Sequence, residues 1–214
     1  MPPAALRAIL RRAHELCPRL EVVCLETRFK TVRAEAVLAW QRRFREWHRA
    51  CGPGGCGTRL AAAPAVLQIS AGYETQDPYL RNAVLWKGYP ENRVQQFFAA
   101  VGRLQQQSGA PVTLDEYVML KPAAGLTDEE GVAEAVETVV HLERLGACFG
   151  VAVSVRLNPT FAAAGSELFY QFRQGGYRPP TLREVYRVLE GCHERGVCLP
   201  VFVGLHDEGL AYAD

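Results

Sequence analysis

Charged and polar side chains gather in this sequence where strand-like apolar runs end. The five groups are Glu26-Thr27-Arg28, Ser70-Ala71-Gly72-Tyr73-Glu74-Thr75, Lys121-Pro122, Arg156-Leu157-Asn158-Pro159-Thr160 and His206-Asp207-Glu208. Parallel α/β folds bind ligands at the carboxyl ends of their strands, so these groups form the candidate site. Gly72 would let a ligand approach the backbone closely. Carboxylates and cations on several adjacent strand ends favour a ligand pocket over an ordinary surface.

Two other interpretations of these side chains stay open. Glu26, Arg28 and Glu74 could simply pair with one another as salt bridges at the mouth of a barrel. Alternatively, the chain could be an independent α/β enzyme that acts through Glu26, Glu74 and His206.

The elements that must position these groups are five short runs rich in β-branched and apolar residues. The runs are LEVVCLE (20–26), AVLQISAG (65–72), DEYVMLK (115–121), GVAVSVRLN (150–158) and LPVFVGL (199–205). They are expected to be apolar on both faces, as strands of a parallel sheet covered by helices must be. Helical patterns lie between them, which predicts an α/β fold with right-handed parallel crossovers, either an open sheet or part of a barrel.

Apolar residues at helical spacing predict the intervening helices. They are expected over 3–16, around the stripe Val37, Trp40, Phe44 and Trp47, over 94–108, from Thr127 to Gly146, and from Thr181 onward. Thr127 has the form of an N-cap, and Thr181 with Glu184 forms a candidate capping box. Residues 1–214 are expected to form a single domain with irregular insertions at 51–64 and 161–180.

The composition is that of a globular protein, with 49% hydrophobic and 22% charged residues. No apolar run approaches the ~20 residues that a membrane span needs, and the N-terminus lacks the features of a secretory signal, so a cytoplasmic location is expected. Seven scattered cysteines fit a reducing compartment. Cys192 continues the apolar stripe of the last helix and is predicted to pack in the core.

The charge is unevenly distributed along the chain. Residues 1–60 carry twelve Lys and Arg against five Asp and Glu, although the net charge of the whole chain is only +1. A basic third of this kind could contact tRNA or another nucleic acid. The other interpretation is a solvated helix face, because no aromatic or glycine-rich element is interleaved to read bases.

Several segments, in collinear order, resemble the radical S-adenosylmethionine (radical SAM) superfamily, in the branch related to MiaB and NifB. Glu26-Thr27-Arg28 is similar to the Glu-Ser-Arg that ends the family's third strand, and Gly72-Tyr73-Glu74-Thr75 is similar to the Gly-x-Glu-Ser of the fourth. Lys87-Gly88 resembles the [Arg/Lys]-Gly that follows, and Leu120-Lys121-Pro122 resembles the fifth strand. Leu157-Asn158-Pro159-Thr160 and Tyr177-Arg178-Pro179-Pro180 are similar to the archaeosine-biosynthesis group.

The resemblance implies a fold and a cofactor site. The fold would be a partial (β/α) barrel with parallel strands, the C-terminal part of the radical SAM core, lacking the first two βα units. The cofactor would be S-adenosylmethionine. Its implied contacts are Ser70, Gly72 and Glu74 on the fourth strand, Lys87 for its carboxylate, Leu120 and Asn158 beside the adenine, and Glu26 and Arg28 toward the methionyl part or the substrate.

The family's iron–sulfur chemistry has no counterpart in this sequence. The Cys-x-x-x-Cys-x-x-Cys loop that holds the [4Fe–4S] cluster occurs nowhere in the 214 residues, so no cluster is expected on this chain alone. His48, Cys51 and Cys56 could supply three zinc ligands, but no fourth ligand has suitable spacing. No metal site is therefore predicted.

The sequence is interpreted as a radical SAM-type fragment. Its complete form would modify an unknown substrate by radical chemistry, and a tRNA nucleoside is the favoured substrate. The alternative is a non-catalytic half-barrel binding module that retains a nucleotide or S-adenosylmethionine pocket. A half-barrel of this kind would expose the edge of the strand at 20–26, so a homo-oligomer or a partner that covers this edge is expected.

Overall fold

The computed structural model describes residues 5, 8–9, 12–13, 16–17, 22–51, 66–109 and 112–204, without the side chains of 44–51, 66 and 108. The predicted helix at 3–16 lies largely outside these residues. The insertion at 51–64 lies almost entirely outside them, and His206-Asp207-Glu208 lies fully outside.

Five parallel strands form one sheet, and their order in the sheet is their order in the chain. The strands are β1 (Val22–Thr27), β2 (Val66–Glu74), β3 (Thr113–Leu120), β4 (Ala152–Pro159) and β5 (Val201–Val203). Each lies within a few residues of a predicted apolar run. The predicted α/β class with parallel strands is therefore confirmed.

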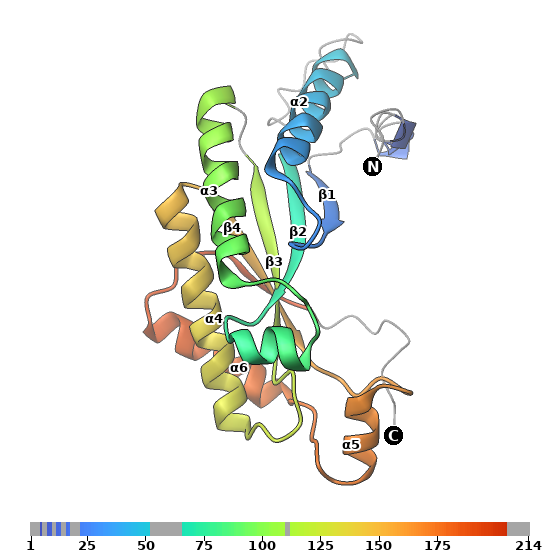
Figure 1. The fold of residues 1–214 in the computed structure, drawn as a ribbon, viewed down its shortest axis with the longest axis vertical. Helices are drawn as coiled ribbons and strands as arrows, with labels where there is room; N and C mark the ends of the chain where they lie inside the picture. Colours follow the sequence, from blue (N-terminus) through green and yellow to red (C-terminus); the bar gives the residue numbers. More distant parts are fainter. Residues whose placement is uncertain are drawn as a thin grey trace.

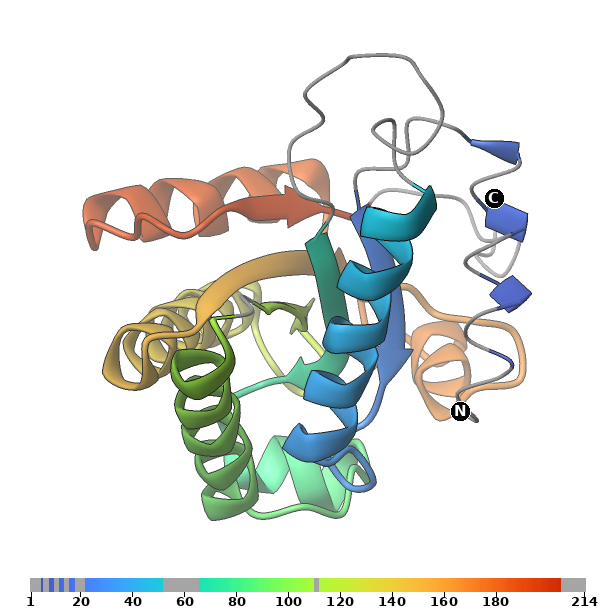
Figure 2. The same cartoon turned by 90° about the horizontal axis from the view of Figure 1, so that it is seen from above.

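The helices follow the same sequential order as the strands. They are α2 (Ala34–Cys51), the π-helix η1 (Leu80–Val84), α3 (Glu91–Ser108), α4 (Asp128–Phe149), α5 (Glu167–Arg173) and α6 (Leu182–Glu194). α2 packs on α3, α3 on α4, and α4 on α6, so these helices cover one face of the sheet (Figures 1 and 2). This arrangement is that of a partial (β/α) barrel. Neither η1 nor α5 was predicted, and α5 lies inside the insertion expected at 161–180.

The predicted helix boundaries coincide with local capping. The Thr127 side chain accepts a hydrogen bond from the backbone N–H of Glu130, and a capping box joins the two residues. A second capping box joins Thr181 and Glu184, as predicted. α3 ends at Gly109, whose φ of 60° places it in the left-handed conformation that glycine adopts without strain.

The apolar core lies between the sheet and these helices. Alternate residues of β2 enter it (Leu67, Ile69, Ala71 and Tyr73) together with Val and Leu side chains of α3 and α4. Cys192 is buried in α6, which confirms its predicted packing, and burial raises the pKa of its thiol to about 11. Within the described part of the chain, no helix is long and apolar enough to cross a membrane.

The opposite face of the sheet is polar, so the expectation of apolar residues on both faces was wrong. Ser70, Asp115 and Ser154 are direct neighbours on β2, β3 and β4 and form hydrogen bonds across that face. Among the described helices, α2, α3, α4 and α6 cover the other face, which carries the apolar core. We call the polar side the concave face, as in a barrel.

Candidate functional site

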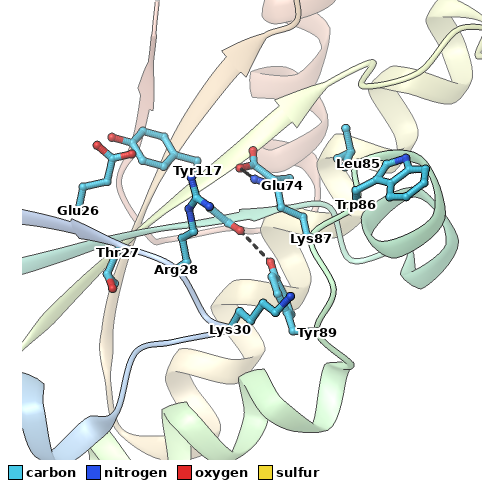
Figure 3. A pocket seen from close by; sticks show the side chains of 11 residues that line it. Glu26, Thr27, Arg28, Lys30, Glu74, Leu85, Trp86, Lys87, Tyr89 and Tyr117 are labelled. Carbon is cyan, nitrogen blue, oxygen red and sulfur yellow. Dashed lines mark hydrogen bonds and ion pairs between the residues drawn. The ribbon is translucent and has the colours of Figure 1, made fainter. Parts of the chain in front are cut away.

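A cavity of about 700 Å³ opens at the carboxyl ends of β1, β2 and β3 (Figure 3). Its walls come from the segment after β1, the tip of β2, the segment between η1 and α3, and one side chain of β3. The lining residues are Glu26, Thr27, Arg28, Lys30, Gly72, Glu74, Leu85, Trp86, Lys87, Tyr89 and Tyr117. The volume lies within the range of small-molecule sites.

The tip of β2 has an irregular backbone that turns Glu74 into the cavity wall. The pairing with β3 shifts its register between Gly72 and Glu74, which marks a β-bulge. Glu74 has a φ of 69°, a conformation that costs a non-glycine residue on the order of 1 kcal/mol or more. Strained backbone of this kind concentrates at ligand sites, where the surrounding structure holds it in place.

Glu74 is paired with Lys87 across the cavity wall. Lys87 Nζ lies 2.6 Å from Glu74 Oε1. Burial raises the pKa of Glu74 and Lys87 lowers it in part, but burial outweighs the lysine and the pKa stays above its usual value. The hypothesis that Glu26, Arg28 and Glu74 pair with one another differs from what the structure shows, because the partner of Glu74 is Lys87.

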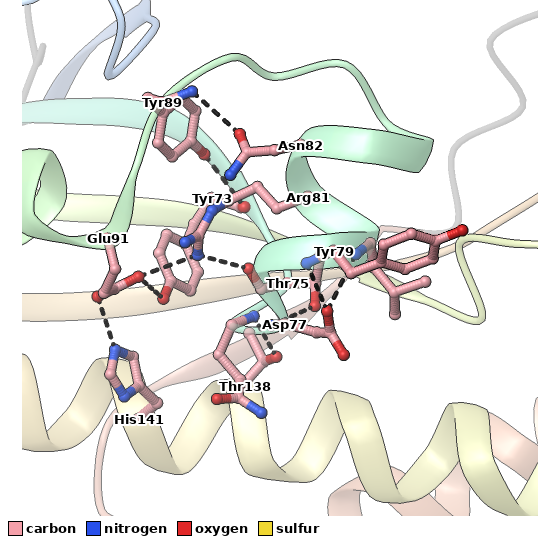
Figure 4. Close-up of polar contacts among 12 residues, drawn as sticks. Tyr73, Thr75, Asp77, Tyr79, Arg81, Asn82, Tyr89, Glu91, Thr138 and His141 are labelled. Atoms are coloured by element: carbon pink, nitrogen blue, oxygen red, sulfur yellow. Dashed lines mark hydrogen bonds and ion pairs between the residues drawn. The ribbon is translucent and has the colours of Figure 1, made fainter.

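Hydrogen bonds tie the segment that carries Lys87 to η1, and Figure 4 shows the one between Tyr89 and Asn82. The backbone N–H of Lys87 donates to the carbonyl of Arg81 at 3.0 Å, and the Tyr89 N–H donates to Asn82 Oδ1 at 3.0 Å. The Tyr89 hydroxyl donates to the Gly72 carbonyl at 2.7 Å, which ties this segment to the tip of β2. The two walls of the cavity therefore support each other.

Two further cations and one carboxylate face the cavity. Arg28 and Lys30 lie on the chain that leaves β1, and Glu26 is the penultimate residue of that strand. In the described part of the chain, none of these three makes an ion pair. Their charges are available for a ligand that carries both signs. Trp86 at the cavity edge is 85% exposed and offers a flat apolar surface.

The structure brings together five of the predicted site residues and separates three. Glu26, Arg28, Gly72, Glu74 and Lys87 all line the cavity. Ser70 lies two residues before Gly72 on β2 and is fully buried. Its hydroxyl donates a hydrogen bond to Asp115. Leu120 belongs to the core on the helix side, and Asn158 lies near the end of β4 beside Gly204.

Several lining residues were not predicted. Thr27 and Lys30 flank Arg28, Trp86 precedes Lys87, and Tyr117 projects from the middle of β3. For Thr27, Lys30 and Trp86, the only signal in the sequence was their position next to a predicted site residue. Tyr117 could have been found from alternation, since it lies two residues after Asp115 and so faces the same side.

Two further hypotheses concern a metal site and an enzyme that acts through a histidine. Within the described residues, no three His, Cys, Asp or Glu side chains converge in a way that could hold a metal ion. The zinc hypothesis on His48, Cys51 and Cys56 and the enzyme hypothesis that needs His206 fall on side chains outside the described residues.

A buried carboxyl group lies on the helix side of β3, close to this site. Glu116 is fully buried, and its two side-chain oxygens have no hydrogen-bond partner in the described structure. Burial, with smaller contributions from the charges of Asp115 and Glu74, raises the pKa of Glu116 well above its ordinary value of 4.5. The raised pKa favours the neutral form of the Glu116 carboxyl group in the folded protein over a wider pH range than in the unfolded chain.

Stability should fall with rising pH because of Glu116. The folded pKa is raised, so the stabilising contribution is complete below the unfolded pKa and is lost as pH rises through the folded pKa. Glu116→Gln cannot ionise, so its free energy of unfolding should gain on the wild-type value as pH rises, and the shift in its favour should be largest at pH 8. That difference should shrink toward pH 5. Urea unfolding at pH 5, 6.5 and 8 measures it, and a constant difference would contradict the assignment.

Searches for relatives by sequence found none: no family model matches the chain, and no curated protein matches it. Solved structures were matched by shape. One is the archaeal Methanocaldococcus infernus Elp3 with an N-terminal deletion, with a TM-score of 0.48 and 11% identity, covering 93% of this chain and 51% of that chain.

Two more matches are D-threo-3-hydroxyaspartate dehydratase from Delftia sp. HT23 and its H351A mutant. Both have a TM-score of 0.30 and 13% identity and cover 93% of this chain. The matched regions make up 52% and 51% of the two dehydratase chains, respectively. The chain thus spans about half the length of the solved structures that it matches.

Proposed function

We propose that the cavity binds S-adenosylmethionine, as the cofactor side of a radical SAM-type site. The observation that carries the proposal is the convergence of three separated segments, Glu26–Arg28, Gly72–Glu74 and Lys87, on one cavity. These are the segments whose sequence resembles the family's cofactor-binding motifs. Their meeting at the carboxyl ends of parallel strands fits that role.

The charges of the cavity suit this ligand. S-adenosylmethionine carries an ammonium, a carboxylate, a sulfonium and an adenine. The carboxylates of Glu26 and Glu74 suit its two cations, and Arg28 and Lys30 suit its carboxylate. The exposed ring of Trp86 offers a stacking surface for the purine.

The described residues do not fit an iron–sulfur cluster. Such a cluster needs three thiolates at one place, and no such group exists among the described side chains. Cys24, Cys148 and Cys192 lie on β1, α4 and α6. The proposal for this chain is therefore ligand binding without a reaction step, which also favours the non-catalytic binding module as the second candidate.

The activity of a whole protein is a further proposal that rests on the resemblance. A radical SAM-type protein of which this chain is a part would use the bound cofactor to modify a substrate, for which a tRNA nucleoside is our choice. The cluster would then be held by residues other than the described ones.

Lys87→Met should weaken S-adenosylmethionine binding by about 10–100-fold, because Lys87 lowers the pKa of buried Glu74 and its loss favours the neutral form of the carboxyl group that suits a ligand cation. The change removes the cation next to Glu74 and leaves that carboxyl group unpaired in the cavity wall. Isothermal titration calorimetry on both proteins measures the effect, and circular dichroism shows that the variant is folded.

The matched control is Arg103→Met, an exposed cation on α3 that does not line the cavity. It should bind like the wild type. S-adenosylhomocysteine and adenosine serve as ligand controls because they lack the sulfonium or the whole amino acid. A wild-type chain that shows no saturable binding of S-adenosylmethionine at millimolar concentration would refute the proposal.

A further inference from the structure

A hydrogen-bonded polar row crosses the middle of the concave face. Ser70, Asp115 and Ser154 lie side by side on β2, β3 and β4. The Ser70 hydroxyl donates to Asp115 Oδ2 at 3.0 Å, and the Ser154 hydroxyl donates to Asp115 Oδ1 at 2.6 Å. Asp115 is fully buried. The apolar core lies on the other face, so core packing does not require this carboxylate.

The carboxylate fixes one arginine. Arg156 Nε donates to Asp115 Oδ2 at 2.5 Å. The two serines hold Asp115 from both sides, so the position of the guanidinium is set by three strands. Nε is the inner donor of the guanidinium, and its use leaves the two terminal Nη groups for another acceptor.

The outer part of Arg156 is accessible. Its side chain is 42% exposed, whereas that of Asp115 is 0% exposed. In the described part of the chain, Arg156 makes an ion pair with Asp115 alone. A counter-ion to buried Asp115 needs only the Nε bond. That role does not require the two terminal Nη groups to be exposed and oriented. An oxyanion is what this donor pair binds best.

The neighbours of Arg156 connect it to the cavity. Tyr117 and Phe202 are its register partners on β3 and β5, so all three lie side by side on the concave face. Tyr117 also lines the cavity, and burial raises the pKa of its hydroxyl, which stays a donor. Phe202 is 53% exposed and supplies an apolar surface on the far side.

We propose that Arg156, oriented by Asp115, binds the carboxylate or phosphate group of a substrate on the concave face, beside the cofactor cavity. Tyr117 separates the two sites and contacts both, and Phe202 packs against the apolar part of the same substrate. The inference rests on the proposed function, because it assigns the substrate side of the site whose cofactor side was proposed above.

The test is a nuclear magnetic resonance titration of arginine side chains labelled with 15N. The Nε–Hε signal of Arg156 is identified by its loss in Arg156→Lys, and its bond to buried Asp115 should protect it from exchange with water. Inorganic phosphate and acetate are added separately at constant ionic strength. We expect a saturable shift of this signal below about 10 mM with one of the two anions, and the better anion identifies the substrate group.

Variants separate binding from structure. Asp115→Asn should abolish the slowly exchanging signal and weaken the anion response at least about tenfold, because the guanidinium loses its fixed orientation. Arg183→Lys, an exposed arginine on α6, should leave the response unchanged. A folded wild type whose Arg156 signal does not shift with either anion refutes the inference and reduces Arg156 to a counter-ion.

A parallel titration with S-adenosylmethionine distinguishes the two proposals. Binding of S-adenosylmethionine without any anion response at Arg156 supports the cofactor proposal and rejects the substrate site. An anion response without S-adenosylmethionine binding supports the oxyanion site and rejects the proposed function. Arg156→Lys should retain S-adenosylmethionine affinity within about threefold, because Arg156 does not line the cavity.

Discussion

Arg81→Met should lower the free energy of unfolding by about 3–5 kcal/mol. Arg81 is fully buried, and its Nη1 forms an ion pair with Glu91 Oε2 at 3.0 Å and donates to the Thr75 carbonyl at 3.0 Å (Figure 4). Its guanidinium carbon lies 5.1 Å and 5.4 Å from the ring centres of Tyr73 and Tyr89. Methionine can fill part of the space, but it restores neither the charge nor the donors.

The partner carboxylate shows why the cost is large. Glu91 also accepts hydrogen bonds from Tyr73 at 2.9 Å and from His141 at 3.0 Å. Burial alone would raise the pKa of Glu91, but the hydrogen bonds from His141 and Tyr73 and the charge of Arg81 outweigh it and lower the pKa. The cluster joins β2, η1, α3 and α4, so losing its cation loosens four elements at once.

Guanidinium chloride unfolding followed by tryptophan fluorescence measures the effect. The matched control is Arg187→Met, which removes the same side chain from an ion pair with Glu129 on the surface at 3.1 Å. That pair is worth less than about 1 kcal/mol because solvent screens it. Similar losses in both variants would show that Arg81 contributes no more than a surface charge.

Arg81 also has a functional consequence. Its backbone carbonyl accepts a hydrogen bond from the Lys87 N–H, and its side chain anchors η1 to Glu91 and to the Thr75 carbonyl, so the position of the segment that carries Lys87 depends on this side chain. If the cavity binds as proposed, Arg81→Met should weaken S-adenosylmethionine binding even at temperatures where the variant remains folded. The residue is a positioning residue, because it does not line the cavity.

The fold was predictable from the sequence to the extent that its signals are local. Strand positions follow from short β-branched runs. The N-cap at Thr127 and the capping box of Thr181 with Glu184 were also expected from local sequence, whereas the capping box at Thr127 was not. η1 was not predicted. Its start is marked by Asp77, whose Oδ1 accepts from the N–H groups of Tyr79 and Leu80, but an aspartate in a loop does not indicate a π-helix by itself.

The candidate site was predictable in part from position along a strand, while Lys87 followed only from the family resemblance. Glu26, Gly72 and Glu74 were expected at strand ends, and they line the cavity. Leu120 lies three residues after Tyr117, so the two side chains face opposite sides of β3 and Leu120 enters the core. The polar concave face depends on register between strands, which no single run contains. Asp115 could not be matched to Ser70 and Ser154 before the pairing was known.

Asp115, at the buried centre of the concave face, is the second position where a substitution should cost much stability. Asp115→Ala is expected to lower the free energy of unfolding by about 2–4 kcal/mol, because the hydroxyls of Ser70 and Ser154 and the Nε of Arg156 lose their acceptor together. The exposed end of Arg156 can turn to water, which keeps the cost below that of an uncompensated buried charge.

A double-mutant cycle with Arg156→Met apportions this loss. Arg156→Met leaves the buried carboxylate with only its two serine donors, so we expect a coupling energy of about 1.5–3 kcal/mol between the two positions. Glu129→Ala is the comparison, because Glu129 is 72% exposed in its pair with Arg187 and its loss should cost less. Additive single losses would mean that Asp115 does not hold Arg156. In that case the serines alone would account for the buried carboxylate, and the oxyanion site would lack the fixed guanidinium on which it depends.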